Sequence, residues 1–280
     1  MSISSVAKKL LPRRHWATAI KLYLKWHRLY FASYRRLFRP NRHYLAVAEQ
    51  NYITDFPPEW TSVSIESADI LVDLESDYSF KLDDVKFAYS SHTIEHLSND
   101  AVRRLFRNIF SAMRRGGVIR VECPDLDRIM DDYKCVHDSD RKVTKLLMKM
   151  VESWNMPKEN GIYDQEHIKL MAAIVNYFDR KYNMPLPPLC SAEEFKEKIS
   201  TLSNSEFGDW AVSLLSPEQL RDSHEHRNWF NFKKLESFLT EAGFSGVVEC
   251  YAGVTRHNFR MNIDRKHRSS YSVYVEAVKT

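Results

Sequence analysis

Short apolar runs alternate along this chain with segments whose apolar residues recur every three or four positions. The runs at 45–48, 60–65, 68–74, 85–90 and 118–123 have the length and composition of buried parallel strands. Apolar residues at 102, 105, 106, 109, 110 and 113 fall on one face of a helix. The pattern therefore predicts an α/β fold in which strands and helices alternate.

The helix before the strand at 118–123 has predicted ends. Asn99 precedes its apolar face and is a residue type that caps helix N-termini. Gly116 and Gly117 follow it and are the first glycines of the chain. Because glycine readily adopts positive φ, we expect this pair to end the helix.

The C-terminal part returns to strands. Residues 232–242 read as a helix closed by Gly243, and 244–251 and 271–278 read as two further strands. Two strands after the last helix predict an antiparallel hairpin at one sheet edge. The predicted fold is a doubly wound, seven-stranded, mostly parallel sheet that ends in this hairpin.

The pattern loosens between about 131 and 221 into amphipathic helices and polar turns. Residues 146–154 and 168–182 look helical, and the proline-rich 184–188 reads as a turn or linker. We interpret this stretch as a helical insertion in a domain covering 44–280. It would lie over the carboxyl ends of the strands, where α/β sheets bind ligands.

Composition and cysteine spacing exclude some classes. With 44% hydrophobic residues in 280, the chain can bury a sizeable core. Its four cysteines lie far apart without a CxxC pair, which indicates neither a zinc ribbon nor a disulfide framework. Reduced thiols in a cytoplasmic protein are the simplest interpretation.

The net charge of +4 conceals a basic N-terminal arm. Residues 1–48 hold 11 Lys and Arg and no acidic residue, so the remaining 30 basic and 37 acidic residues give a net charge of −7. Aromatic and apolar residues of the arm share one helical face, and the opposite face is largely basic. We therefore expect 1–43 to be a basic amphipathic helical extension.

Two main interpretations of the arm stay open. It packs on its own domain or on a partner protein, including a second subunit, or residues 8–42 lie on an anionic membrane surface. The interrupting charges exclude a membrane span. Nucleic acid binding is the least favoured of the three.

Several motifs, in this order, resemble the class I S-adenosylmethionine-dependent methyltransferases, and more narrowly a type 11 bacterial group found among surface-polysaccharide genes. The matching segments are ADILVDL at 68–74, YSSHTIEHL at 89–97, RGGVIRVECPDL at 115–126, residues 235–244, and SVYVEA at 272–277. The resemblance spans most of 44–278 apart from the insertion. It implies the seven-stranded fold, S-adenosylmethionine as cofactor and a small-molecule or glycan acceptor.

The chain departs from that family after the first strand. The family has a glycine-rich turn there, whereas this chain has Ala48, Glu49 and Gln50. A side chain forced into positive φ costs about 1–2 kcal/mol, which weakens such a turn. The acid that holds the ribose hydroxyls after the second strand is replaced by Ser64.

The resemblance assigns site residues by position. For the cofactor they are Ala48, Glu49, Ser64, Asp73, Leu74, Ser90 and Ser91, with Asp73 facing the adenine amine. The candidate catalytic residues are His92, Asp125 and His226. Imidazole titrates near working pH, so either histidine could be a general base. Each could equally be structural: Asp73 as a capping acid, the serine cluster as a helix entry, and the histidines as satisfied buried groups.

An alternative is a zinc protease motif, because His92-Thr-Ile-Glu-His96 matches HxxEH with Glu166 as a third ligand. It is disfavoured because this motif needs a long helix of its own, and no metal site is expected. The favoured function is O-methylation of a sugar or glycan intermediate of surface-polysaccharide synthesis by a cytoplasmic enzyme, peripheral at the membrane. The alternative function is a non-catalytic methyltransferase-like subunit.

Overall fold

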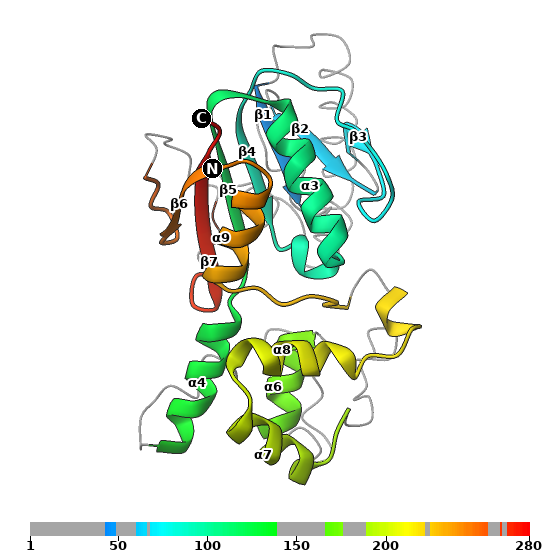
Figure 1. Cartoon of the computed structure of the whole chain (residues 1–280), viewed down its shortest axis with the longest axis vertical. Helices are drawn as coiled ribbons and strands as arrows, with labels where there is room; N and C mark the ends of the chain where they lie inside the picture. The colour runs from blue at the N-terminus through cyan, green and yellow to red at the C-terminus, as the bar shows by residue number, and fades with distance from the viewer. Residues whose placement is uncertain are drawn as a thin grey trace, which may run out of the picture.

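A computed structural model describes residues 43–48, 60–65, 68–138, 166–175, 189–221, 225–256, 264 and 268–280. Seven strands form one sheet in the order β3-β2-β1-β4-β5-β7-β6 (Figure 1). The strands are β1 (Tyr44–Ala48), β2 (Trp60–Ser64), β3 (Ile70–Leu71), β4 (Val85–Ser91), β5 (Met113–Pro124), β6 (Ser245–Cys250) and β7 (Ser272–Val278).

Strands β1 to β5 pair in parallel, and β7 runs antiparallel to both β5 and β6. The predicted C-terminal hairpin is therefore confirmed, with β7 placed between the fifth and sixth strands. This order is the one typical of the methyltransferase fold. The predicted fold class is confirmed.

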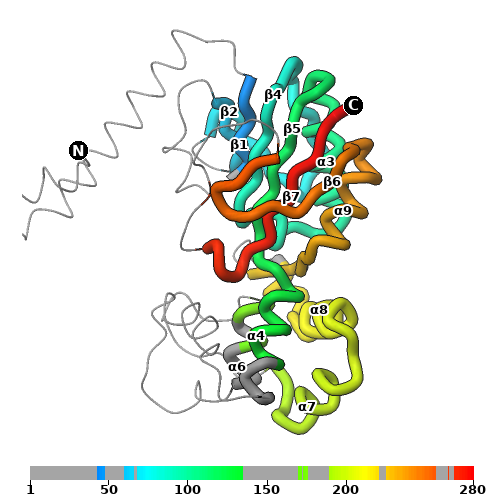
Figure 2. The backbone as a smooth tube through the Cα atoms, turned by 90° about the vertical axis from the view of Figure 1, so that its left-hand side faces the viewer, coloured from blue at the N-terminus to red at the C-terminus, as the bar shows by residue number. Residues whose placement is uncertain are grey.

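The helices fall into two groups (Figures 1 and 2). Helices α3 (Asn99–Ala112) and α9 (Phe232–Glu241) cover one face of the sheet. The second group lies beyond the carboxyl end of β5 and consists of α4 (Leu126–Asp138), α6 (Glu166–Val175), α7 (Ala192–Thr201) and α8 (Asn204–Ser213). Two 3-10 turns complete the described elements, η3 (Ile94–His96) and η6 (Gln219–Arg221).

Each group has its own apolar core. The sheet core joins strand residues such as Val47 and Val121 to Leu105 of α3 and Leu239 of α9, all fully buried. The helical core gathers residues of α4, α6, α7 and α8, and Trp229 packs into it from the segment before α9. Burial of apolar surface of this kind is the main stabilising contribution in both groups.

The start and end of α3 differ from the prediction. The N-cap is Ser98, whose hydroxyl accepts a hydrogen bond from the Ala101 amide at 3.3 Å, and Asn99 is the first helical residue. The helix ends at Ala112 and passes directly into β5. The predicted glycine stop was wrong because Gly116 and Gly117 lie within that strand.

The glycine pair has another role in β5. Gly116 has φ +73° and its amide donates to the Lys279 carbonyl at 2.7 Å. A side chain at Gly117 would lie 2.9 Å from the Val85 carbonyl oxygen. These glycines therefore let β5 approach its neighbours closely where the strand begins.

The predicted strand at 68–74 is reduced to two residues. Strand β3 is a sheet edge that pairs only with β2, and Leu71 is 66% exposed. The apolar run indicated a buried strand, but a parallel edge strand has only one neighbour and its side chains need not be covered.

Several predicted elements lie outside the described residues, namely the extension at 1–42, the helix at 146–154 and the linker at 184–188. The second insertion helix is described as α6 over 166–175. Within the described ranges no helix is long and apolar enough to cross a membrane.

Candidate functional site

The carboxyl ends of β1, β4 and β5 meet at one edge of the sheet. Val47 pairs with Ser90, Ala48 pairs with Ser91, and Ser91 pairs in turn with Glu122 of β5. This junction of strand ends is where parallel α/β sheets bind ligands. The structure therefore brings together Ala48, Ser90 and Ser91, three of the predicted cofactor residues.

Ser90 has a buried polar atom without a partner. The residue is 1% exposed, and its hydroxyl makes no hydrogen bond within the described part of the chain. A buried hydroxyl without a partner costs free energy, so a polar ligand group beside it would be favourable. Ser90 thus fits the predicted role at the cofactor.

The Ser91 side chain belongs to a hydrogen-bond network on the face of the sheet opposite to Ser90. Its hydroxyl donates to Glu122 Oε2 at 3.1 Å, and the Tyr89 hydroxyl donates to the same atom at 2.5 Å. Tyr274 donates to Glu122 Oε1 at 3.1 Å. Three hydroxyl donors therefore satisfy a carboxylate that is fully buried. Burial and the nearby Glu122 charge raise the pKa values of Tyr89 and Tyr274 well above the usual range, so both hydroxyls stay protonated.

His92 follows β4 and has a left-handed conformation, with φ +46°. Its amide donates to the Glu122 carbonyl at 2.8 Å. Its Nε2 lies 2.9 Å from the Ser272 hydroxyl, and its Nδ1 lies 3.1 Å from Glu95 Oε1. Both ring nitrogens are engaged and the residue is buried, so the structure favours a positioning role over direct proton transfer.

Asp73 and Leu74 follow the short edge strand β3. Asp73 is exposed, and one carboxylate oxygen accepts from the Glu75 amide at 3.0 Å. That contact belongs to a turn, in which the Ser76 amide also donates to the Asp73 carbonyl at 3.0 Å. Leu74 is 9% exposed and belongs to the sheet core. A cofactor contact by Leu74 would therefore come from its backbone.

The ribose end of the predicted site is the least complete. Ser64 is the last residue of β2 and is buried, and its carbonyl accepts from the Val72 amide at 3.0 Å. Glu66, the carboxylate nearest to Ser64 in the sequence, lies outside the described residues, and the next, Asp69, is held by the Ser62 amide and hydroxyl, both at 2.9 Å. Glu49 lies outside the described residues.

Asp125 begins α4. One carboxylate oxygen accepts from the Asp127 amide at 3.2 Å, and its amide donates to the Tyr271 carbonyl at 2.9 Å. It is therefore a helix cap, the ordinary structural role for an acid there. Burial raises its pKa from the ordinary 3.8 to about 6, although the Arg128 charge opposes the shift.

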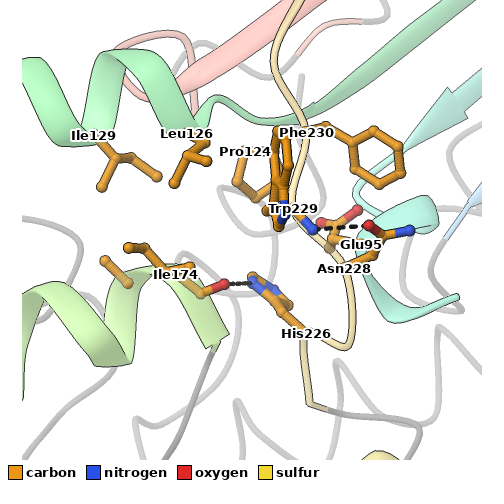
Figure 3. A pocket seen from close by; sticks show the side chains of 10 residues that line it. Glu95, Pro124, Leu126, Ile129, Ile174, His226, Asn228, Trp229 and Phe230 are labelled. Carbon is orange, nitrogen blue, oxygen red and sulfur yellow. Dashed lines mark hydrogen bonds between the residues drawn. The ribbon is translucent and has the colours of Figure 1, made fainter. Parts of the chain in front are cut away.

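His226 lies in a pocket between the sheet and the helical group (Figure 3). The acid and base groups in its wall are Glu95 and His226, and the rest of the wall is apolar apart from Asn228. The His226 ring is held by a contact of 3.1 Å between Nδ1 and the Ile174 carbonyl. That contact makes Nδ1 the donor and leaves the lone pair on Nε2.

One segment, residues 225–231, connects all parts of this pocket. The His226 amide donates to the Val175 carbonyl of α6 at 3.2 Å, and the Asn228 amide donates to the Glu95 carbonyl of η3 at 3.1 Å. The Phe230 carbonyl accepts from the Leu126 amide of α4 at 2.8 Å. The backbone of this extended segment therefore joins the sheet to the helical group.

A partly buried cation, Lys234, lies beside the pocket and was not found from the sequence. Lys234 Nζ lies 3.9 Å from the centre of the Trp229 ring and 2.7 Å from Asn228 Oδ1. Burial lowers its pKa from the ordinary 10.5 to about 8, although the Asp209 charge opposes the shift. On sequence alone Lys234 reads as an exposed position of an amphipathic helix.

The protease-like motif does not form the helix that it needs. Residues 94–96 make only a 3-10 turn, and His92 points to Ser272 and Glu95 rather than to a shared site with His96. Glu166 is the first residue of α6, and its side chain lies outside the described atoms. Instead, Glu95 and His96 meet His226 from the segment before α9, with ligand atoms within 4.8 Å of one another.

Comparisons with known proteins were made by sequence and by fold. No protein-family model and no curated protein matches the sequence. Among solved structures, the methyltransferase SibL is 12% identical, with a TM-score of 0.37 over 91% of this chain and 55% of that one. A methyltransferase of Thermotoga maritima is 13% identical, with a TM-score of 0.38 over 93% of this chain and 96% of that one. One of Archaeoglobus fulgidus is 12% identical, with a TM-score of 0.37 over 90% of this chain and 94% of that one.

This chain thus spans little more than half the length of SibL. All three TM-scores lie below 0.5, so these structures add no support. The methyltransferase fold is defined here by the strand order alone.

Proposed function

We propose that this protein is an S-adenosylmethionine-dependent methyltransferase that acts on a hydroxyl acceptor. The observation that carries the proposal is the strand order, in which antiparallel β7 lies between β5 and β6. The unpartnered Ser90 hydroxyl at the junction of β1 and β4 supports it. S-adenosylmethionine, when bound, supplies an electrophilic methyl group on a sulfonium sulfur.

The residues at the strand ends suit different parts of the cofactor. Asp73 would accept a hydrogen bond from the adenine amine, and Ser64 would face the ribose. Ser90, with the turn at Ala48 and Glu49, would line the methionine end, and Ser91 would contribute only its backbone there, because its hydroxyl donates to Glu122. Positioning by such contacts is the main requirement for an in-line transfer, since no covalent enzyme intermediate is needed.

The acceptor hydroxyl would reach the pocket beside Glu95 and His226, whose free space admits a group about the size of one water molecule. The hydroxyl proton would pass to this acid–base pair while the new carbon–oxygen bond forms and the carbon–sulfur bond of the sulfonium breaks. His92 would hold Glu95 in place through their contact at 3.1 Å. A sugar or glycan intermediate of surface-polysaccharide synthesis is the acceptor class that we propose, on the sequence resemblance alone.

Calorimetry with S-adenosylmethionine and S-adenosylhomocysteine tests the proposal. We expect a Kd tighter than roughly 100 μM, or about −5.5 kcal/mol. No binding at millimolar ligand would contradict it. That outcome would favour the second candidate, a non-catalytic methyltransferase-like subunit. Two features of the sequence support this candidate: Ser64 replaces an acid, and no glycine follows β1 directly.

We further propose that residues 8–42 bind an anionic membrane surface or a partner protein. The proposal is supported by their excess of Lys and Arg. Flotation of the intact chain with anionic and with neutral vesicles distinguishes a membrane from a protein partner. Binding to anionic vesicles alone supports the membrane, and equal behaviour with both excludes it.

A further inference from the structure

Three side chains that commonly bind metal ions gather at the boundary between the sheet and the helical group. Glu95 and His96 belong to η3, and His226 comes from the segment before α9. One ligand atom from each lies within 4.8 Å of the other two. The two imidazole rings are 4.9 Å apart at their centres and nearly perpendicular.

Both histidines are oriented by backbone carbonyls. His96 Nδ1 lies 3.1 Å from the Glu225 carbonyl oxygen, and His226 Nδ1 lies 3.1 Å from that of Ile174. Each Nδ1 therefore carries the proton, and each Nε2 carries the lone pair that a metal needs. This arrangement is the usual outer shell of a histidine that binds zinc.

Glu95 has an outer-shell partner of the same kind. Its Oε1 lies 3.1 Å from His92 Nδ1, and His92 is itself held by Ser272. The carboxylate is 2% exposed and His226 is 7% exposed. A divalent cation beside a buried carboxylate offsets the cost of burying that charge.

We propose that Glu95, His96 and His226 bind one divalent transition-metal ion, with Zn²⁺ the ion that suits them best. Two imidazoles and one carboxylate form a set of three ligands that leaves a fourth position open. Ligand atoms around Zn²⁺ at about 2.0–2.1 Å lie roughly 3.3 Å apart, so the three groups must close slightly on binding.

The open position would face the pocket that Glu95 and His226 line (Figure 3). An acceptor hydroxyl bound there would lose its proton more readily, because a bound Zn²⁺ lowers the pKa of an oxygen ligand. Glu95 and His226 would then hold the ion rather than take the proton themselves, and the proton would pass to water. Only this consequence rests on the proposed methyl transfer, and the metal site itself does not.

Zn²⁺ titration of the untagged full chain, stripped with a chelator, tests the site without cofactor or acceptor. We expect saturable binding of about one ion per chain, with a rise in Tm as Zn²⁺ is added. Co²⁺ in place of Zn²⁺ should give the visible absorption of a four-coordinate nitrogen and oxygen site. A failure here leaves the S-adenosylmethionine titration unaffected, so the two proposals are tested separately.

Substitutions locate the ion. His96→Ala and His226→Ala should each weaken Zn²⁺ binding by more than roughly 10–100-fold, which is the cost of losing an outer-shell partner. Glu95→Gln tests the carboxylate with little change of shape. His43→Ala is the matched control, since the His43 ring also contacts a carbonyl, that of Asp84, at 3.1 Å, and it should bind Zn²⁺ normally. Absence of saturable binding by the wild type, or unchanged affinity in both histidine variants, would overturn the proposal.

Discussion

The Glu95 carboxylate lies 3.1 Å from Nδ1 of His92, three positions earlier in the chain, and both side chains are buried. His92 follows β4 and has φ +46°, a conformation that is uncommon for a residue with a side chain. The contact holds the chain as it turns from the strand into η3. It also fixes the direction in which Glu95 enters the pocket, so the strand end and the candidate site depend on each other.

Asp73→Ala should weaken S-adenosylmethionine binding at least 10-fold. A carboxylate that accepts a hydrogen bond contributes about 1.5–3 kcal/mol, and 1.4 kcal/mol is a factor of ten. Calorimetry measures the change. Asp77→Ala is the control, because that side chain is fully exposed and lies 3.8 Å from Arg104. Equal affinity in both variants would show that Asp73 does not face the adenine.

Glu122→Gln should lower the free energy of unfolding by about 2–3 kcal/mol, since the carboxylate is buried and accepts from three hydroxyls. Urea denaturation at pH 7 measures this loss. Glu241→Gln removes a carboxylate that is 40% exposed and pairs with Arg103 and Arg107 at the surface. Its expected cost is clearly smaller, because solvent screens these surface ion pairs. A similar loss in the two variants would contradict the importance of the buried network.

Asp125→Asn should change how stability depends on pH. The carboxyl has a pKa of about 6 in the folded protein and an ordinary value of 3.8, so the folded state holds more protons between these values. The contribution of Asp125 to stability is therefore fully present below pH 4, and it is lost as pH rises through 6. The wild type should lose on the order of 2–3 kcal/mol relative to the variant across this window. Urea titrations at several pH values check this, and parallel curves for the two proteins would exclude the shift.

Gly208→Ala should destabilise the protein by about 1–3 kcal/mol, although alanine favours helices. An added Cβ would lie 2.7 Å from Leu126 Cδ2 and 2.7 Å from Trp229 Cγ, where the helical group meets the pocket. Thermal unfolding measures the effect. Ser205→Ala in the same helix should be nearly neutral, and a stabilised Gly208→Ala would show that this contact can relax.

The sheet was predictable from the sequence because its strands follow simple patterns. The runs of β1, β4 and β5 are mostly apolar, although Arg120 and Glu122 interrupt β5, and the two segments after α9 have the composition of strands. The limits of α3 were not predictable in the same way. Ser98 and Asn99 are both good capping residues, and only the contact of the Ser98 hydroxyl with the Ala101 amide distinguishes them.

The candidate site was predictable in part. Ser90, Ser91 and His92 were found because they end a recognisable strand, and His226 was found by resemblance. The contact of Glu95 with His92 was not predicted. The contact of His96 with His226 was not predictable, because it joins residues 130 positions apart in the chain. The contacts of Lys234 with Trp229 and Asn228 were not predictable, because a partly buried lysine leaves no periodic signal in the sequence.

The position of β7 has a consequence for biosynthesis. Its two neighbours, β5 and β6, both precede it in the chain, and they are not hydrogen-bonded to each other. Until residues 272–278 leave the ribosome, β5 presents an unpaired edge and β6 has no strand to join. Such an edge is prone to association with other chains. Chaperone demand during synthesis should therefore be greatest just before this strand emerges.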